Sequence, residues 1–318
     1  MGLQIPCWIY LPKGAKGFVS DFSIDLIDSD YAGSGEKKLG KQYGRQEVCD
    51  RLRAETKKGK PIVAAGAGIG LSAKFAEAGG ADLIIIYNSG LYRMDGLPSI
   101  AGYMPFGDAN AVVKEMGLRH VFPIVRNAPV IAGICAYDLT RDMENFLKEL
   151  LTVGFSGVIN FPTVGRIDGD FRRSMEDLGM SYKREAEVMG IAGSLGFFTM
   201  AYVFNPEESK MMAEKGIDAV VAHMKTTSGG SVGSQRPMTL AEAGKRCKKI
   251  FQAALTANPD VLCLAHGGPI EGPEGTEYIY RHTQAVGFVG ASSIERLPTE
   301  EAIRKITKKF KAQKIKNK

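Results

Sequence analysis

Short apolar runs alternate with segments of helical periodicity along most of this chain. Eight such runs are rich in Val, Ile, Leu, Ala and Phe, and most of them end at a glycine or a polar residue. Continuous apolar runs of this length are typical of buried parallel strands. We therefore expect strands at residues 61–65, 83–87, 130–135, 157–160, 197–204, 219–223, 261–265 and 287–290.

The segments between these runs predict helices. We expect one helix ahead of the first strand, at residues 45–57, and others at 71–78, 109–116, 141–153, 174–178, 182–195, 206–215, 239–256, 274–286 and 299–311. Thr239 followed by Glu242 is the signature of a capping box, so Thr239 should begin its helix. Thr299 is the expected N-cap of the last helix. Residues 88–107, 161–172 and 225–237 remain as unusually long loops.

Eight strand–helix units over about 250 residues predict an α/β protein with the (β/α)8 TIM-barrel fold. A doubly wound open sheet is the structural rival, but such sheets normally have fewer strands and a single switch point. We assign residues 1–44 to a partly irregular N-terminal extension, 45–311 to the barrel and 312–318 to a basic tail.

Charge and cysteine usage narrow the class of protein. Residues 304–318 hold eight Lys or Arg and no acid within a chain of net charge +6. Such a tail can bind nucleic acid or an acidic surface, but no nucleic-acid-binding motif accompanies it, so we expect a solvated helix end. The five cysteines are scattered without a CxxC pair and are typical of buried side chains in a reducing compartment.

No apolar run approaches the roughly 18 residues that span a bilayer, and the first residues lack the charge order of a signal peptide. We therefore expect a cytoplasmic protein with neither a membrane nor a nucleic-acid partner. Loops of the observed length over a barrel mouth act as lids or as partner contacts, and the second role predicts a homo-oligomer.

Four side chains at the expected strand ends are candidates for catalysis, because TIM-barrel sites lie at that end. His223 and His266 end neighbouring strands and could form an acid/base pair or bind a metal. Asp138 follows the third strand. Lys225, two residues after His223, could hold a carboxylate or form a Schiff base. The structural alternatives are histidines that bond backbone carbonyls and a solvated lysine.

Small residues after the last two strands predict an anion cradle. We expect the N–H groups around Gly267, Gly268, Gly290, Ala291 and Ser292 to hold a phosphate or a carboxylate. The other substrate-binding candidates also stand at strand exits: Gly66, Gly68, Asn88, Ser89, Arg93, Asn160 and Glu295. The Gly66–Gly68 turn is similar to a dinucleotide fingerprint, but no acid closes the next strand. No ligand spacing assigns a metal site, and Mg²⁺ is kept as an optional cofactor.

Several long motifs occur in a recognisable order: IVAAGAGIGLSAKFAEAGGADLIIIYNSG, GDANAVV, GVINFPTVGRIDGDFR, VAHMKTTSGGSVG and HGGPI…GFVGASSIERLPTE. Over residues 43–307 the chain resembles the phosphoenolpyruvate hydrolase-like TIM-barrel family, which also supplies the C-terminal barrel of Tm-1-like proteins. The resemblance implies a mouth lined by these segments. Arg93 matches an arginine of the family's second-strand loop, whereas Leu91 and Leu97 replace two others. The KKCGH-type loop of the isocitrate lyase/phosphoenolpyruvate mutase barrels is missing.

These observations favour an enzyme acting on a small phosphorylated or carboxylated metabolite at the barrel mouth. Phosphate-ester hydrolysis and lyase cleavage of a C–C bond in a phosphoenolpyruvate-like substrate both fit, with Asn88, Asn160 and Lys225 orienting the substrate. The alternative is a non-catalytic barrel that senses a metabolite. A third hypothesis is an interaction role for the N-terminal extension and the basic tail.

Overall fold

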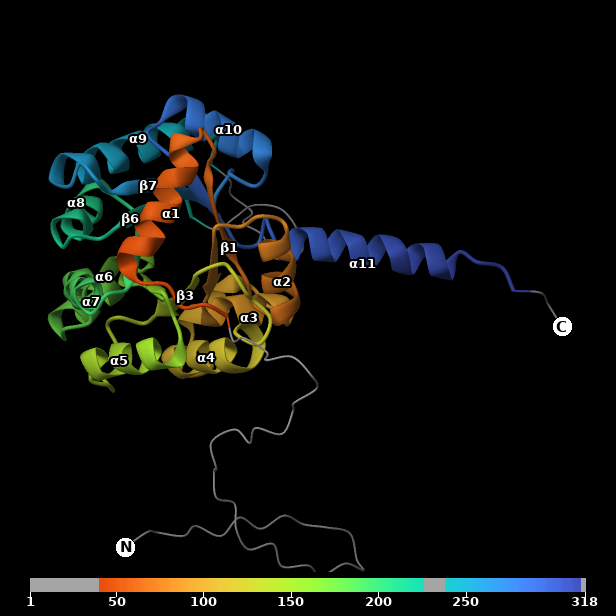
Figure 1. The fold of residues 1–318 in the computed structure, drawn as a ribbon, viewed down its shortest axis with the longest axis horizontal. Helices are drawn as coiled ribbons and strands as arrows, with labels where there is room; N and C mark the ends of the chain where they lie inside the picture. Colours follow the sequence, from red (N-terminus) through yellow and green to blue (C-terminus); the bar gives the residue numbers. More distant parts are fainter. Residues whose placement is uncertain (1–39, 226–237, 316–318) are drawn as a thin grey trace, which may run out of the picture. The chain divides into compact units, whose positions relative to one another are not determined.

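The computed structural model describes residues 40–225 and 238–315. Within them, eight parallel strands pair in chain order, and β8 closes the barrel against β1 (Figure 1). The strands are β1 (Ile62–Gly66), β2 (Leu83–Ile86), β3 (Val130–Ile134), β4 (Gly157–Asn160), β5 (Phe198–Val203), β6 (Ala219–His223), β7 (Leu262–His266) and β8 (Gly287–Gly290). The predicted TIM barrel is confirmed.

Helical segments surround the strands, except that α11 extends away from the barrel (Figure 1). They are α1 (Arg45–Lys57), α2 (Gly70–Ala78), α3 (Asn88–Met94), η1 (Ser99–Tyr103), α4 (Ala109–Met116), η2 (Gly117–Val121), α5 (Met143–Val153), η3 (Val164–Arg166), α6 (Gly169–Asp177), α7 (Tyr182–Ser194), α8 (Pro206–Glu214), α9 (Leu240–Ala257), α10 (Pro273–His282) and α11 (Arg296–Lys311). No helix in the described ranges is both long and apolar enough to cross a membrane.

The strand register decides which side chains reach the mouth of the barrel. Side chains alternate between the two faces of a strand, and His223 stands opposite His266 in the pairing of β6 with β7. Both histidines are the last residues of their strands. The two rings therefore project from the same face at the same level, at the C-terminal end of the barrel.

The opposite, N-terminal side of the barrel is anchored by α1. Val48 and Leu52 are buried on its inner face, as the sequence predicts. Arg45, at the start of α1, donates to both carboxylate oxygens of Asp218 at 3.0 Å. Just before the helix, Tyr43 is buried and its backbone N–H donates to Ser156 Oγ at 2.9 Å. The predictions for residues 1–39, 226–237 and 316–318 lie outside the described residues.

Several local predictions are wrong. Residues 161–172 are not an open loop, because η3 lies within them and α6 begins at Gly169 rather than at residue 174. Residues 88–107 are not an open loop, because α3 and η1 fold within them. The last helix begins at Arg296 rather than at residue 299, since Pro298 falls in its first turn, where a missing N–H costs nothing. Helix α10 ends at His282 rather than at residue 286, because the chain must enter β8.

Candidate active site at the mouth of the barrel

Aromatic and imidazole rings form a continuous cluster where the strands end. His223 and His266 lie 4.7 Å apart between ring centroids, and Tyr202 lies 5.1 and 5.2 Å from them. Phe161 connects Tyr202 to further rings. We call the following residues the ring cluster: Tyr87, Tyr103, Phe161, Tyr202, Phe204, His223 and His266.

His266 is held in one orientation by the end of the neighbouring strand. Its Nδ1 lies 2.6 Å from the backbone oxygen of Val289, which can only accept, so Nδ1 carries the proton. Burial lowers the pKa of His266 from 6.5 to about 4. At neutral pH the ring is therefore uncharged, and Nε2 keeps a lone pair that can accept a proton.

His223 lies beside it with an uncommitted nitrogen. The residue is only 6% exposed, and its Nδ1 has no hydrogen-bond partner among the described residues. Burial, followed by the neighbouring His266, lowers the pKa of His223 well below its usual value. A buried polar atom without a partner is costly and is common where a ligand completes the site.

A hydrogen-bonded network lies behind the ring cluster. Asn160 accepts a bond from the backbone N–H of Tyr202 at 2.7 Å and donates to Glu185 Oε2 at 2.7 Å. The other oxygen of Glu185 accepts from the N–H of Val164 at 2.6 Å. Burial raises the pKa of Glu185 to about 8. This network positions Tyr202 and the exit of β4, and Asn160 is the residue that joins Glu185 to Tyr202.

The loop after β1 is bound by a carboxylate of the chain itself. Glu295 accepts from the backbone N–H of Gly68 at 2.8 Å and from Nε of Arg93 at 2.8 Å, and it also contacts Nη2 of Arg93. Arg93 and Glu295 are almost completely buried. The carboxylate of Glu295 therefore takes up donor groups of Gly68 and Arg93, two residues that the sequence predicts to bind substrate. A Cβ on Gly66 would lie 2.8 Å from Tyr87 Oη, so this loop packs tightly.

The turn after β7 is compact, and some of its backbone N–H groups bond to backbone carbonyls of the chain. Gly267 and Gly268 have φ of +74° and +59°, and a Cβ on either would collide with a carbonyl oxygen, that of Lys225 or of Met224. The N–H of Gly268 donates to the carbonyl of Lys225 at 3.1 Å. Lys225 itself has φ of +70° and an exposed side chain. Its backbone thus shapes the turn beside His223 and His266.

The turn after β8 also uses its own backbone groups. The carbonyl of Ala291 accepts from Glu295 N–H at 3.1 Å, and the carbonyl of Ser292 accepts from Leu297 N–H at 2.9 Å. Gly290 is an outward-facing residue of β8, and a Cβ there would meet Ile294. These contacts fold the turn so that Glu295 reaches Arg93.

Three further candidates hold loop structure. Asn88 donates to the carbonyl of Gly102 at 2.9 Å and accepts from the N–H of Ser89 at 2.8 Å, joining α3 to η1. Asp138 accepts from Arg141 Nη1 at 2.6 Å and from Thr140. The bonds from Thr140, Arg141 and Asn110 outweigh burial and keep the pKa of Asp138 below its usual value. Its role as an acid/base group stays a prediction.

The carboxylates near the mouth bear on whether Mg²⁺ could be held there. Magnesium is usually held by one or two carboxylates together with water and substrate oxygens. Glu295 and Asp138 follow strands and Glu185 lies on α7, and each of these carboxylates accepts hydrogen bonds from protein donors. Within residues 40–225 and 238–315 no group of three His, Cys, Asp or Glu side chains could hold a metal ion.

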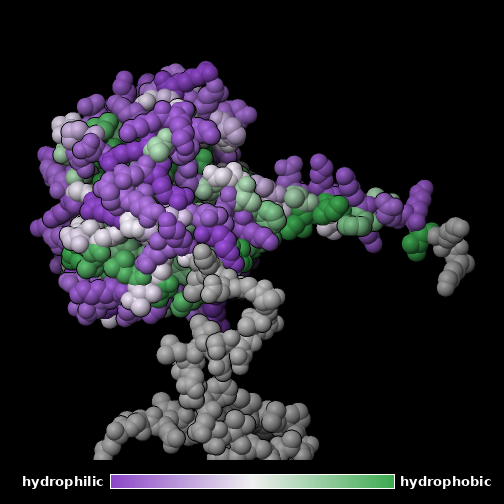
Figure 2. All heavy atoms as spheres, in the orientation of Figure 1, coloured by the Kyte–Doolittle hydropathy of each residue, from purple (hydrophilic) through white to green (hydrophobic). Residues whose placement is uncertain are grey.

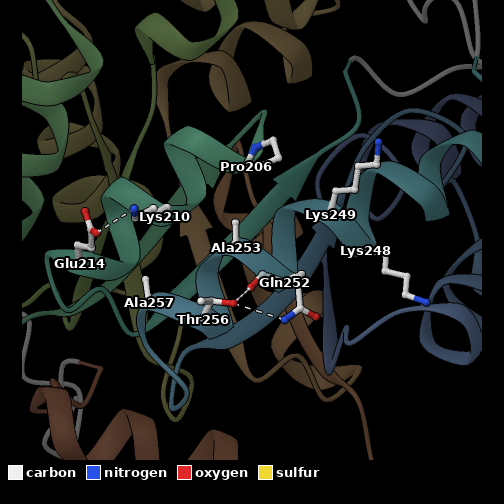
Figure 3. A pocket seen from close by; sticks show the side chains of 9 residues that line it. All are labelled: Pro206, Lys210, Glu214, Lys248, Lys249, Gln252, Ala253, Thr256 and Ala257. Atoms are coloured by element: carbon white, nitrogen blue, oxygen red, sulfur yellow. Dashed lines mark hydrogen bonds and ion pairs between the residues drawn. The ribbon is translucent and has the colours of Figure 1, made fainter.

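One surface hollow lies away from this site. It is on the outer wall between α8 and α9, and none of the candidate site residues lines it (Figure 3). Lys210 pairs with Glu214 at 3.7 Å within α8, while Lys248 and Lys249 point in different directions. The hollow therefore presents no convergent set of polar groups.

Sequence reasoning missed much of the support around the two histidines. Glu185 was not a candidate because it lies on a helix rather than at a strand end, although an acid on the buried stripe of α7 is unusual. The aromatic members of the ring cluster come from several strand exits, and no spacing along the chain connects them. Their proximity follows only from closure of the barrel.

The fold and the mouth define a TIM-barrel protein with a buried pair of uncharged imidazoles at its C-terminal face. The chain belongs to the phosphoenolpyruvate hydrolase-like family, whose model matches residues 47–313. It is 49% identical over 266 residues to the ToMV susceptible protein tm-1(GCR26) of Solanum lycopersicum. That match covers 83% of this chain and 35% of the tomato protein, so the chain spans about a third of this relative.

Solved structures of the same fold include a hydrolase and a lyase. Phosphonopyruvate hydrolase in complex with oxalate and Mg²⁺ matches with a TM-score of 0.55 and 17% identity, over 83% of this chain and 87% of that one. 2,3-Dimethylmalate lyase, a member of the PEP mutase/isocitrate lyase superfamily, matches with a TM-score of 0.54 and 15% identity, over 84% and 88%. At these identities the likeness shows the fold.

Proposed function

We propose that the barrel mouth binds a small phosphorylated or carboxylated metabolite and that His223 and His266 move protons during its hydrolysis or C–C cleavage. The observation that carries this proposal is the buried pair of imidazoles, 4.7 Å apart, of which His223 keeps an unpartnered Nδ1. Pairs of titratable groups with strongly shifted pKa values in a buried site are typical of acid/base catalysis.

An anionic ligand would change the protonation of this pair. A negative charge within a few ångströms favours the charged imidazolium and raises the pKa of the histidine. Nε2 of His266 would then accept a proton from water or from the substrate, while its Nδ1–H stays on Val289. The two histidines are buried within the ring cluster, and the Asn160–Glu185 network keeps Tyr202 in place.

Two reaction classes follow from the family and the fold neighbours. The family name and the name of phosphonopyruvate hydrolase support hydrolysis. The name of 2,3-dimethylmalate lyase supports cleavage of a C–C bond. Because the hydrolase structure contains Mg²⁺, each assay is run with and without that ion.

The experiment that tests the proposal is a turnover assay on phosphoenolpyruvate and oxaloacetate, reading phosphate, pyruvate and oxalate release. The wild type should turn over at least one of them, and His266→Ala should lose activity by more than 100-fold, the usual scale for losing a general acid or base. His282→Ala is the matched control, because His282 also contacts a carbonyl through Nδ1 but is exposed. Equal activity of His266→Ala and His282→Ala would contradict the assignment.

A non-catalytic metabolite sensor is the second candidate function. The observation that favours it is that Asp138, Glu185 and Glu295 are all engaged by protein donors, which leaves the imidazoles alone for acid/base work. A sensor would be stabilised by a ligand that it never consumes.

A further inference from the structure

Within the ring cluster, two polar atoms are buried without a hydrogen-bond partner among the described residues. They are Nδ1 of His223 and the phenol oxygen of Tyr103. Tyr103 ends η1, where Asn88 holds the carbonyl of the preceding Gly102 at 2.9 Å, and its ring lies 5.2 Å from that of Phe161, directly after β4. Buried polar atoms are normally paired. Two unpaired atoms in one ring cluster indicate that a ligand supplies the partner.

The short helix η3 lies directly against the ring cluster. Glu185 accepts from the N–H of Val164, the first residue of η3, at 2.6 Å. A Cβ on Gly165 would lie 2.4 Å from the ring of Phe204, so the backbone of η3 packs on that ring. The ring of Phe204 lies 4.9 Å from that of His223. The last residue of η3 is therefore held close to the mouth.

That last residue is Arg166, which is half-buried. Burial lowers the pKa of both His223 and His266, and the charge of Arg166 adds to this effect. Burial raises the pKa of Tyr103, and the same charge opposes that rise. Coulomb interactions weaken with distance, so the guanidinium lies close to all three side chains. With five N–H donors it can bind an anion and keep contacts of its own.

Other predicted anion donors at the mouth are used by the chain itself. Arg93 and the N–H of Gly68 bind Glu295, so Arg93 already has a counter-charge. The N–H of Gly268 donates to the carbonyl of Lys225. An external anion therefore has more to gain from η3 than from these groups.

The surroundings of η3 favour a carboxylate. Hydrophilic side chains cover much of the outer helices on the face drawn in Figure 2, where water weakens ion pairs. The ring cluster instead surrounds a ligand with aromatic carbon, which strengthens charge-assisted hydrogen bonds. A guanidinium binds a carboxylate through two parallel N–H···O bonds. The single charge of Arg166 matches one carboxylate, whereas a phosphate dianion needs a further cation.

We propose that Arg166 and Tyr103 bind a carboxylate of the substrate and thereby direct the rest of the molecule toward His223 and His266. The substrate class narrows to small carboxylic acids anchored between the exits of β2 and β4. The role of the histidines rests on the proposed function, whereas the carboxylate subsite is argued from η1 and η3 alone.

The test is the affinity of the full chain for oxalate, measured by isothermal titration calorimetry with and without Mg²⁺. Arg166→Gln should weaken binding roughly 10- to 100-fold, the range for a hydrogen bond to a charged group. Arg166→Lys keeps the charge but loses the fork and should fall between the two. Arg173→Gln is the matched control, because Arg173 is exposed on α6 and pairs with Asp170. Inorganic phosphate should bind more weakly than oxalate.

Tyr103→Phe gives an independent signature. It should weaken oxalate binding about 10-fold yet leave the melting temperature of the free protein unchanged, because its hydroxyl has no partner among the described residues. Tyr182→Phe is the contrast: its hydroxyl donates to the carbonyl of Tyr202 at 2.6 Å, so the free protein should melt earlier. A lower melting temperature of Tyr103→Phe would remove Tyr103 from the subsite.

The outcomes separate the subsite from the proposed function. Equal oxalate affinity of Arg166→Gln and Arg173→Gln, or no oxalate binding by the wild type, overturns the subsite even if His266→Ala abolishes turnover. Oxalate binding that depends on Arg166 in a protein that turns over no substrate supports the subsite and contradicts the catalytic role. Tighter binding of phosphate than of oxalate overturns the choice of a carboxylate.

Discussion

The two histidines at the mouth differ in how their nitrogens are used. His266 donates from Nδ1 to Val289, which fixes its tautomer, whereas Nδ1 of His223 has no partner among the described residues. Burial keeps the pKa of both rings below the usual value. One ring is therefore oriented and the other is available, which is the arrangement that a proton-transferring pair needs.

Glu185 gives a prediction for pH dependence. Burial raises its pKa from 4.5 to about 8, so between these values the native state keeps a proton that the unfolded state has lost. Stability from this group is fully present below pH 4.5 and is lost as pH rises toward 8, at a slope of at most about 1.4 kcal/mol per pH unit.

Glu185→Gln should remove this slope, because glutamine does not titrate. The free energy of unfolding of the wild type relative to that of the variant, measured by urea denaturation, should be lower at pH 8 than at pH 5, because only the wild type loses stability over this range. Glu187→Gln on the same helix is the control and should leave the slope as in the wild type. A gap that is the same at both pH values would show that Glu185 is ionised in the native protein.

At the scale of elements, the β8–α11 turn joins the first and last parts of the barrel. Its contact with the rest of the barrel is the buried pair of Arg93 and Glu295. Removing one partner of a buried pair leaves the other charge without compensation and typically costs about 3–5 kcal/mol, whereas an apolar replacement of both can be nearly neutral.

Glu295→Leu should therefore lower the free energy of unfolding by about 3–5 kcal/mol. Arg93→Met/Glu295→Leu should recover most of this loss, and chemical denaturation of wild type, both single variants and the double variant measures the coupling. Additive losses in this cycle would contradict a direct buried interaction between the two side chains.

The start of α9 offers a second prediction at this scale. Thr239 forms a complete capping box with Glu242. Thr239→Ala should lower the free energy of unfolding by about 1 kcal/mol. Thr299→Ala is a useful control, because Thr299 lies inside α11 and caps nothing. If thermal or urea denaturation shows the larger loss for Thr299→Ala, the boundaries of these two helices are misassigned.

The contrast between these two threonines shows how far sequence reaches for single elements. Both precede an acid-containing apolar segment, and the sequence predicts both as N-caps. For Thr239 this is confirmed. For Thr299 it is wrong, because Glu295 is held by Arg93 and Gly68 and lets the helix begin before Pro298. Local pattern cannot anticipate a boundary set by a contact more than 200 positions away in sequence.

At the scale of the whole molecule, the barrel was predictable because each strand coincides with a short apolar run in the sequence. The positions of His223 and His266 at neighbouring strand ends follow from the same reasoning. The ring cluster, the Asn160–Glu185 network and the outward course of α11 were not predictable. Each depends on which side chains meet after closure, and the sequence pattern does not contain those distances.

At this scale we expect the mouth of the barrel to be one binding site around the imidazoles of His223 and His266. A ligand that binds only the native state raises the melting temperature in proportion to its concentration over Kd. We expect no rise in melting temperature from anions in the hollow between α8 and α9, because its polar groups do not converge. Substitutions at His223 and at Lys249 distinguish ligand binding at the mouth from ligand binding in the hollow.

The most direct measurement is a thermal-shift titration with phosphoenolpyruvate and oxalate, each with and without Mg²⁺, on the wild type, His223→Ala and Lys249→Ala. We expect a concentration-dependent rise in melting temperature for the wild type and for Lys249→Ala. His223→Ala should lose that rise, with the melting transition of the free protein still cooperative. A shift retained by His223→Ala, or no shift for the wild type with either anion, would contradict an anion site at the imidazole pair.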